Sequence, residues 1–208
     1  MPLRQRGGAL FLVSLHLFSN MSDKPSLRQQ ALLSRRNLSH SERLEKSLEI
    51  HARLMDYLAC NNDISHVLLY RSLADEVGTH ALFQQISQTI FSPVTHISGH
   101  MKWHEVRPET VWQKGDFGVD EPETGRLWTP DFGPTMLICP MAGFDRQGNR
   151  LGMGRGCFDR WLEHSGNHMQ SIAGFAFSCQ EVVEIPSDAH DISMQIIFTE
   201  SEAIQCLK

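Results

Sequence analysis

Three glycines that alternate with larger residues, Gly152, Gly154 and Gly156, form the part of the sequence best suited to chemistry. Glycine has no side chain and readily adopts positive φ, so the backbone amides of such a segment can close around phosphate oxygens. A helix is expected next, and its start would add a positive dipole end. Arg150 and Arg155 bring positive charge to the segment. The pattern predicts a phosphate-binding loop, although a tight turn would use the same glycines and the GxxxxGK[ST] motif of a P-loop is absent.

Asp159 directly follows this loop. Its carboxylate is a hard oxygen ligand of the kind suited to the Mg²⁺ that accompanies ATP. A carboxylate at the start of a helix also stabilises the helix dipole, and the two roles are compatible. Cys157, inside the loop, could act as a nucleophile, but no histidine is placed to activate it, which favours a structural role.

Two other pairs of charged residues are weaker candidates on residue type alone. Lys24 and Arg28 are four residues apart, so they share one helix face, and such a face is most often simply solvated. Asp75 and Glu76 follow an apolar run, where a polar turn would account for them.

Hydrophobic periodicity predicts two helices and then an alternation of strands and helices. Pro25 suits the first turn of a helix that extends to about residue 37. Ser39 and Glu42 form a capping-box signature for a second helix, to about residue 60. Further helices are expected at 79–91 and 158–164, a long ordered loop at 107–134, and strands at 66–70, 94–97, 101–106, 135–139, 171–177 and 194–199.

This alternation predicts an α/β fold, a three-layer α/β/α sandwich around a mostly parallel, Rossmann-like sheet. Ligands of such sheets bind outside the carboxyl ends of the strands. A chain of 208 residues suits one domain, which we expect over residues 21–208. Residues 1–20 are expected to be an N-terminal extension upstream of a start at Met21. A signal peptide is the alternative, but no small-x-small cleavage site follows the apolar run at 9–18.

Charge and cysteine content exclude several classes of partner. The formal net charge of −5 provides no positive field for a nucleic-acid backbone or an acidic membrane, so neither is expected as a partner. The five cysteines include no CxxC pair and are odd in number, which argues against a disulfide framework or a zinc cluster. We therefore expect a protein of the reducing cytoplasm.

The glycine segment and its flanks resemble the 5-formyltetrahydrofolate cyclo-ligase family, also called methenyltetrahydrofolate synthetases. The family pattern of an apolar strand, Pro, Phe-Asp, Gly, Arg-Leu-Gly-x-Gly-x-Gly, two aromatics and Asp is followed from Pro140 to Asp159. Weaker matches occur in the family's order along the chain, at Lys24 and Arg28, Asp75-Glu76-Val77, Phe117–Pro122, Gly174-Phe-Ala-Phe, Gln180, Pro186, His190-Asp191 and Thr199-Glu200. The resemblance extends from about residue 24 to residue 200.

The resemblance implies an ATP- and Mg²⁺-dependent enzyme that closes 5-formyltetrahydrofolate to 5,10-methenyltetrahydrofolate and releases ADP and phosphate. An amide oxygen is a poor leaving group, so phosphorylation of the formyl oxygen would turn it into a good one and make the carbon electrophilic toward N10. Such an enzyme mainly positions ATP beside the formyl group and neutralises phosphoryl charge. A cytoplasmic monomer that acts on this small molecule is expected.

The resemblance also implies roles for particular residues. Arg155 would be the catalytic residue that stabilises the transferred phosphoryl group, and Asp159 and Asp191 would hold Mg²⁺. The nucleotide-binding residues would be Lys24, Pro25, Ser26, Leu27 and Arg28 on the first helix and Arg150, Leu151, Gly152, Met153, Gly154, Arg155, Gly156, Cys157 and Phe158 in the loop. The folate-binding residues would be Arg71, Glu76, Met153, Gly154, Arg155, Gly156 and Cys157.

The chain departs from the family pattern at two places. Cys157 and Phe158 stand where the family has a second aromatic and then Tyr, and Arg71 stands where an apolar residue is more frequent. The lost tyrosine hydroxyl leaves open a folate- or nucleotide-binding protein without turnover. A third hypothesis, a sugar-phosphate isomerase or transferase on a similar sheet, predicts no requirement for ATP.

Overall fold

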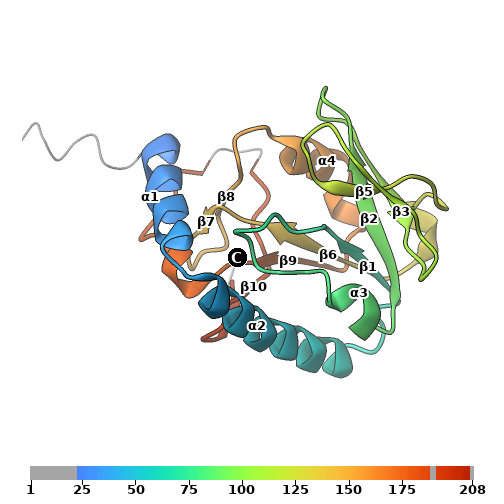
Figure 1. The fold of residues 1–208 in the computed structure, drawn as a ribbon, viewed down its shortest axis with the longest axis horizontal. Helices are drawn as coiled ribbons and strands as arrows, with labels where there is room; N and C mark the ends of the chain where they lie inside the picture. The colour runs from blue at the N-terminus through green and yellow to red at the C-terminus, as the bar shows by residue number, and fades with distance from the viewer. Residues whose placement is uncertain (1–22, 188–190, 207–208) are drawn as a thin grey trace, which may run out of the picture.

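A seven-stranded sheet lies at the centre of the computed structural model, which describes residues 23–187 and 191–206 (Figure 1). The strand order is β11-β10-β9-β6-β1-β2-β3; neighbours from β10 to β2 are parallel, and the edge strands β11 and β3 are antiparallel. The strands are β1 His66–Leu69, β2 Thr89–Thr95, β3 Met101–Glu105, β6 Thr135–Pro140, β9 Ser171–Phe175, β10 Ile196–Phe198 and β11 Ala203–Gln205. The extension predicted at residues 1–20 lies outside the described residues.

Both faces of this sheet are buried. On β1, Val67 and Leu69 belong to the apolar cluster of one face, whereas Leu68 belongs to that of the other. Strand β6 alternates in the same way, with Met136 on the first face and Leu137 on the second. Strands buried on both faces show continuous apolar runs in sequence, which explains why both were predicted.

Helices cover the two faces. The long helix α2 (His40–Cys60) and the single turn α3 (Leu82–Gln85) pack on the first face, and α4 (Cys157–Ser165) packs on the second. Figure 1 shows α2 and α4 on opposite sides of the strands. The predicted three-layer α/β/α fold is therefore confirmed.

The first two helices form as their sequences predict. In α1 (Lys24–Arg36), Pro25 lies in the first turn. In α2, the capping box predicted at Ser39 is present, because the Glu42 N–H donates to Ser39 Oγ (3.2 Å) and the Ser39 N–H donates to Glu42 Oε2 (2.7 Å). These reciprocal bonds satisfy two of the amides that a helix start leaves unpaired.

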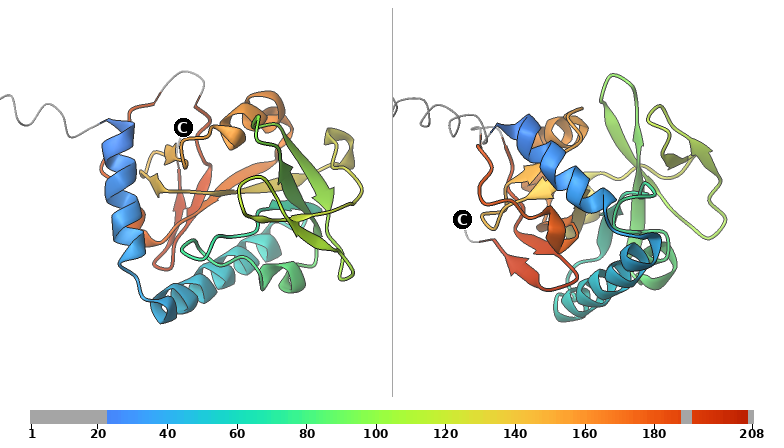
Figure 2. Two further views of the ribbon diagram at one scale, coloured as in Figure 1. Left: turned by 45° about the horizontal axis from the view of Figure 1, so that its top comes forward. Right: turned by 60° about the vertical axis from the view of Figure 1, so that its left-hand side comes forward.

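Helix α1 packs against one end of the sheet, where the two views of Figure 2 show it beside the short ribbon of β7 (Gly143–Phe144) and β8 (Arg150–Leu151). A Cβ placed on Gly143 would lie 2.9 Å from the Cβ of Ala31, so glycine allows the helix to approach the ribbon closely. A small third apolar cluster, which includes Leu27 and Leu151, fills this contact. The cluster fixes helix α1 beside the glycine segment.

The helix predicted at 79–91 is wrong. Only the turn Leu82–Gln85 is helical, and Thr89 already begins β2, which pairs with β1 in the register His66↔Thr89. The Thr79 side chain donates to the carbonyl of Tyr70 (2.7 Å) and accepts from the Ser72 N–H, which holds this residue in a loop. β-branched and aromatic residues after position 88 favour the strand, and tertiary pairing outweighs the helical periodicity.

The strand predicted at 94–97 is the second half of a longer one. Strand β2 contains Pro93, which lacks an N–H and is unusual inside a sheet. It lies beyond the residues of β2 that pair with β1, in the part that pairs with β3 alone. The missing donor therefore costs no ladder hydrogen bond to β1.

The segment predicted as a loop at 107–134 contains regular structure. Strands β4 (Trp112–Lys114) and β5 (Asp120–Pro122) form an antiparallel hairpin, followed by a 3₁₀ turn at Pro130–Phe132. Further 3₁₀ turns lie at Gly166–His168 and Ser178–Gln180. No helix in the described part of the chain is both long enough and apolar enough to cross a membrane.

Two leucines of α2 provide a test of the packing. Leu54 is fully buried under the sheet, whereas Leu48 is 53% exposed on the same helix. Leu54→Ala is expected to lower the free energy of unfolding by about 2–5 kcal/mol, because it removes apolar contacts and leaves a cavity. Leu48→Ala is expected to change it by less than about 0.5 kcal/mol. Urea denaturation measures both, and equal effects would contradict this placement of α2.

Candidate active site

A cavity of about 340 Å³ opens at the carboxyl ends of β1, β2 and β6. Residues that line it immediately follow or end these strands: Tyr70 after β1, Thr95 in β2 and Met141 after β6. The chain leaves β1 for β2 through α3 on one face and leaves β6 for β9 through α4 on the other, so the connections diverge between β1 and β6. This divergence point is where doubly wound sheets bind ligands.

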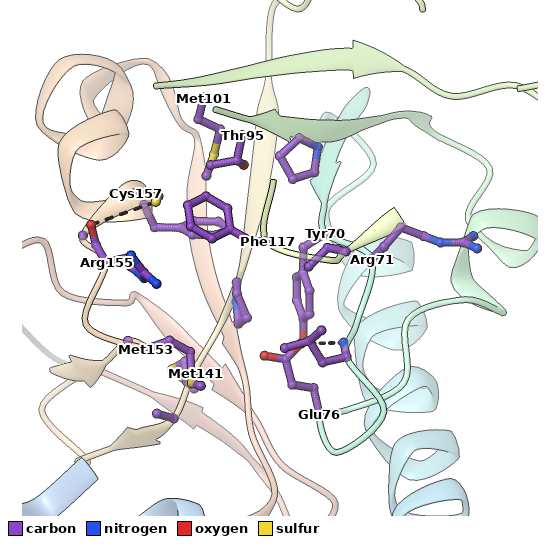
Figure 3. Close-up of a pocket in the computed structure, with 18 of the residues that line it drawn as sticks. Tyr70, Arg71, Glu76, Thr95, Met101, Phe117, Met141, Met153, Arg155 and Cys157 are labelled. Atoms are coloured by element: carbon purple, nitrogen blue, oxygen red, sulfur yellow. Dashed lines mark hydrogen bonds between the residues drawn. The ribbon is translucent and has the colours of Figure 1, made fainter. Parts of the chain in front are cut away.

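Two walls face each other across the cavity. Figure 3 shows Met153, Arg155 and Cys157 on one side, and Tyr70 and Glu76 on the other. Apolar side chains from three separate segments complete the lining: Phe117 of the β4–β5 hairpin between the walls, Met101 of β3 beside Thr95, and Met141, after β6, beside Met153. The cavity is therefore an apolar slot with a cationic loop at one wall and a carboxyl group at the other.

The glycine loop occupies the first wall in a conformation that requires glycine. Gly154 (φ 86°) and Gly156 (φ 66°) are in the left-handed region, and Gly156 is the N-cap of α4. None of the described residues accepts a hydrogen bond from the backbone N–H groups of residues 153–156. The loop therefore offers unpaired amides at a helix start, an arrangement that suits phosphate oxygens.

The predicted cations of the first helix reach this loop. Arg28 Nε donates to the carbonyl of Gly152 (2.6 Å), and the Arg28 guanidinium lies 3.9 Å from the position of a Cβ on Gly154. Lys24 Nζ lies 2.6 Å from Asp191 Oδ2. The closely packed α1 thus brings Arg28 to the glycine loop, more than a hundred residues later in the chain, and brings Lys24 to Asp191.

Arg150 connects the two predicted metal ligands. One of its terminal nitrogens forms an ion pair with Asp159, and the other donates to the carbonyl of Ile192 (3.0 Å), next to Asp191. Each carboxylate proposed for Mg²⁺ therefore faces a cation proposed for phosphate. Without ligands, Asp159 and Asp191 are each paired with a cation.

The carboxylates suit a metal that arrives with a nucleotide. No group of three or more His, Cys, Asp or Glu side chains that could hold an ion occurs among residues 23–187 and 191–206. Mg²⁺ is commonly bound by one or two carboxylates together with substrate phosphates and water. Asp159 and Asp191, 42% and 28% exposed, fit that mode.

Glu76 forms the acidic end of the cavity. Its side chain is 8% exposed, and burial raises its pKa above the ordinary value of 4.5, against the opposing effects of the Leu73 N–H, which donates to Oε2 (2.9 Å), and of Arg35. A buried carboxyl group with free acceptor capacity is a strong site for a ligand's N–H donors. Asp75, its neighbour, pairs with one terminal nitrogen of Arg35 (2.8 Å), and Glu76 Oε1 lies 4.0 Å from the other.

Arg35 is a residue that sequence reasoning missed. It lies at the end of α1, is 1% exposed, and bonds to both Asp75 and the carbonyl of Met141 (3.4 Å). Gln180 donates to the same carbonyl (2.8 Å). Arg35 thus joins the acidic segment to the end of β6. An arginine so deeply buried would not be expected from its place in a polar helix sequence.

The other residues predicted to bind nucleotide or folate do not all face the cavity. Arg71 lines the cavity, but Figure 3 shows its guanidinium turned away, and it stacks on Trp112 (4.1 Å to the ring centroid). Leu27 and Leu151 are buried in the third apolar cluster and do not line the cavity. Pro25 and Ser26 are exposed at the start of α1.

Positions 157 and 158 both line the cavity. The ring of Phe158 packs edge-on against Trp103 (6.2 Å), and the Cys157 thiol lies 4.0 Å from the carbonyl oxygen of Arg155. The chain has two tyrosines, and Tyr57 bonds to Ser171 elsewhere (3.3 Å). Tyr70 therefore supplies the phenol of the cavity wall, on the side opposite the glycine loop. Tyr70 and Met101 were not identified by their sequence patterns, and Phe117 was matched only as part of Phe117–Pro122 without a role, because only the fold brings these separate segments together.

The fold and the site together define a doubly wound α/β protein with a glycine loop at a carboxyl-edge cavity. Residues 20–200 match the model of the 5-formyltetrahydrofolate cyclo-ligase family, and the chain belongs to this family.

Named relatives come from bacteria and from mouse. The chain is 28% identical over 184 residues to the 5-formyltetrahydrofolate cyclo-ligase of Haemophilus influenzae, which covers 84% of this chain and 96% of that protein. It is 28% identical over 203 residues to the mouse protein of the same name, and the match covers 88% of this chain and 96% of that protein. The solved structure of the 5,10-methenyltetrahydrofolate synthetase of Aquifex aeolicus is similar with a TM-score of 0.74 and 27% identity, covering 89% of this chain and 93% of that one.

The raised pKa of Glu76 predicts a pH dependence of stability. A carboxyl group whose pKa is higher in the folded state contributes stability that is complete below its unfolded pKa and is lost as the pH rises through the folded value. Glu76→Gln cannot ionise, so its free energy of unfolding is expected to fall less than that of the wild type between about pH 4 and pH 7. Urea titrations at each pH measure the difference. Exposed Glu45→Gln is the control, and identical pH profiles for wild type and Glu76→Gln would contradict the effect.

Proposed function

We propose that this protein converts 5-formyltetrahydrofolate to 5,10-methenyltetrahydrofolate with consumption of ATP, in the presence of Mg²⁺, and with release of ADP and phosphate. The observation that carries the proposal is the opposition of Glu76 to the glycine loop across one apolar cavity. A folate held by its pterin ring at the carboxyl end would point its formyl group toward bound phosphates. Family membership supports the same reaction.

The nucleotide would bind along the glycine loop. The unpaired amides of residues 153–156 would donate to phosphate oxygens, and Lys24, Arg28, Arg150 and Arg155 would supply positive charge. Arg28 is already fixed to the loop carbonyl at Gly152, so its position costs little further ordering on binding. Phosphoryl transfer mainly requires such positioning and charge neutralisation.

The folate would occupy the apolar slot. The pterin ring presents an N–H and an amino group on one edge, and the Glu76 carboxylate has acceptors for both. The side chains of Met101, Phe117 and Met141 would contact the faces of the flat ring and exclude water. Exclusion of water also protects an activated formyl group from hydrolysis.

The reaction balances with the substrates named. The formyl oxygen attacks the γ-phosphorus of ATP, the bond to the β-γ bridging oxygen breaks, and ADP leaves. The lone pair of N10 then attacks the formyl carbon, N10 loses its proton, and the carbon–oxygen bond breaks to release phosphate. The ring closes with a C=N bond between carbon and nitrogen. Arg155, which lines the cavity with its guanidinium 5.6 Å from the centroid of the Phe117 ring, would stabilise the charge on the transferred phosphoryl group.

Asp159 and Asp191 would hold Mg²⁺, which when bound neutralises part of the phosphate charge. The ion pairs that Lys24 and Arg150 make with these carboxylates would then be replaced by contacts with phosphates. The five cysteines are all free in the structure, which supports the proposed cytoplasmic location. A single domain over residues 21–208 and a monomeric state stay predictions.

The decisive experiment follows the absorbance of methenyltetrahydrofolate. Purified protein with 5-formyltetrahydrofolate, ATP and Mg²⁺ is expected to produce the product, and omission of either ATP or Mg²⁺ is expected to abolish it. Product formation without ATP would contradict the proposal and favour an enzyme of another class. A folded protein that binds ATP without turnover, and gains activity through Phe158→Tyr, would indicate the impaired binding protein instead.

Arg155→Ala tests the assignment of the catalytic residue. Loss of one preorganised cation at the phosphoryl group is expected to lower kcat at least about a hundredfold. Folate affinity is expected to change far less, because Glu76 and the apolar slot stay intact. Arg107→Ala, an exposed arginine paired with Glu105, is the control. Unchanged kcat in Arg155→Ala would contradict the role of Arg155 in stabilising the transferred phosphoryl group.

A further inference from the structure

The glycine loop is contacted by Arg160, a residue to which the proposed function assigns no role. Arg160 lies on α4, one turn after Gly156, and its Nη2 donates to the backbone carbonyl of Arg155 (2.9 Å). The same nitrogen lies 4.0 Å from the Cys157 thiol. The N-cap Gly156 makes no side-chain capping bond, so the loop enters the helix without the usual fixation. Arg160 provides a bond at that point.

The same guanidinium packs on a distant turn. Gly99 lies between β2 and β3 with φ 86°, and a Cβ placed on it would lie 1.7 Å from Arg160 Nη2. The turn is itself closed by hydrogen bonds from Gly99 N–H to the His96 carbonyl (2.7 Å) and from His96 N–H to the His100 carbonyl (2.9 Å). Absence of a side chain at 99 thus makes room for Arg160 between this turn and the glycine loop.

Arg160 has no carboxylate within ion-pair distance among the described residues, in contrast to Arg150. An exposed arginine on a helix would ordinarily be a solvated side chain of little consequence. Here its bond acts on a particular peptide group. The C=O and N–H of a trans peptide point in opposite directions, so fixing the Arg155 carbonyl toward Arg160 turns the Gly156 N–H away from it. Gly156 lines the cavity, and this N–H has no acceptor among the described residues.

We propose that Arg160 is a positioning residue that orients the Arg155–Gly156 peptide for phosphate binding by bracing the glycine loop against the Gly99 turn. The inference rests on the proposed function, because it assumes that this loop binds ATP. It assigns Arg160 no contact with either substrate. Gly99 is the partner of Arg160 in this arrangement, since any side chain there would displace the guanidinium.

The first test compares ATP affinity by calorimetry in the full-length wild type, Arg160→Ala, Arg160→Lys and Glu163→Ala. Glu163 is exposed on the same helix and serves as the matched control. Arg160→Ala is expected to weaken ATP binding about tenfold, the worth of one charge-assisted hydrogen bond. KM for 5-formyltetrahydrofolate and the melting temperature are expected to stay unchanged. Lysine keeps the positive charge but lacks the planar guanidinium, so the ATP affinity of Arg160→Lys is expected to lie between those of the wild type and Arg160→Ala.

The second test is a double-mutant cycle with Gly99→Ala. The added methyl group is expected to displace Arg160 and weaken ATP binding, and in the Arg160→Ala background the same substitution is expected to add little. If the wild type binds ATP, two results would overturn this inference and leave the proposed function intact. One is additive effects of the two substitutions, and the other is an ATP affinity of Arg160→Ala equal to that of the wild type. A wild type that does not bind ATP would overturn the proposed function and this inference with it.

Discussion

The parallel pairing of β1 with β6 is the constraint on which the site depends. Their register, His66↔Thr135 to Leu69↔Ile138, places the two strand ends at the same edge of the sheet. The acidic segment that follows β1 and the glycine segment that follows β6 therefore open from adjacent points. A slip of one residue would exchange the buried faces of a strand, and the apolar clusters on both sides oppose it. The cavity is thus secured by the core.

Buried charge connects this edge to helix α1. Arg35 bonds to Asp75 and to the carbonyl of Met141, so the end of α1 is tied to both sides of the cavity. The first turns of α1 present Arg28 to the glycine loop and Lys24 to Asp191. Removal of one partner from such a buried pair leaves an uncompensated charge, which makes the arrangement specific. A single helix therefore serves both the acidic wall and the phosphate loop.

The two walls of the cavity suit two different ligands. An anion-binding loop of unpaired amides and arginines suits ATP, and a buried carboxyl group beside apolar side chains suits a flat ring with N–H donors. The pairs Arg150–Asp159 and Lys24–Asp191 hold the two carboxylates against cations in the ligand-free site. Binding of a metal–nucleotide complex would exchange these pairs for phosphate and metal contacts.

The sequence alone determined the α/β class, the first two helices with the capping box at Ser39, and the glycine loop, because these depend on local periodicity and on residue chemistry within a few positions. Tertiary structure decided that Thr89 to Phe91 form a strand, since pairing with β1 outweighs a weak helical period. It also decided which distant residues meet, including Tyr70 with Phe117, Arg35 with Asp75, and Arg160 with Gly99. Contacts of this kind depend on sheet register and helix packing, which no local pattern specifies.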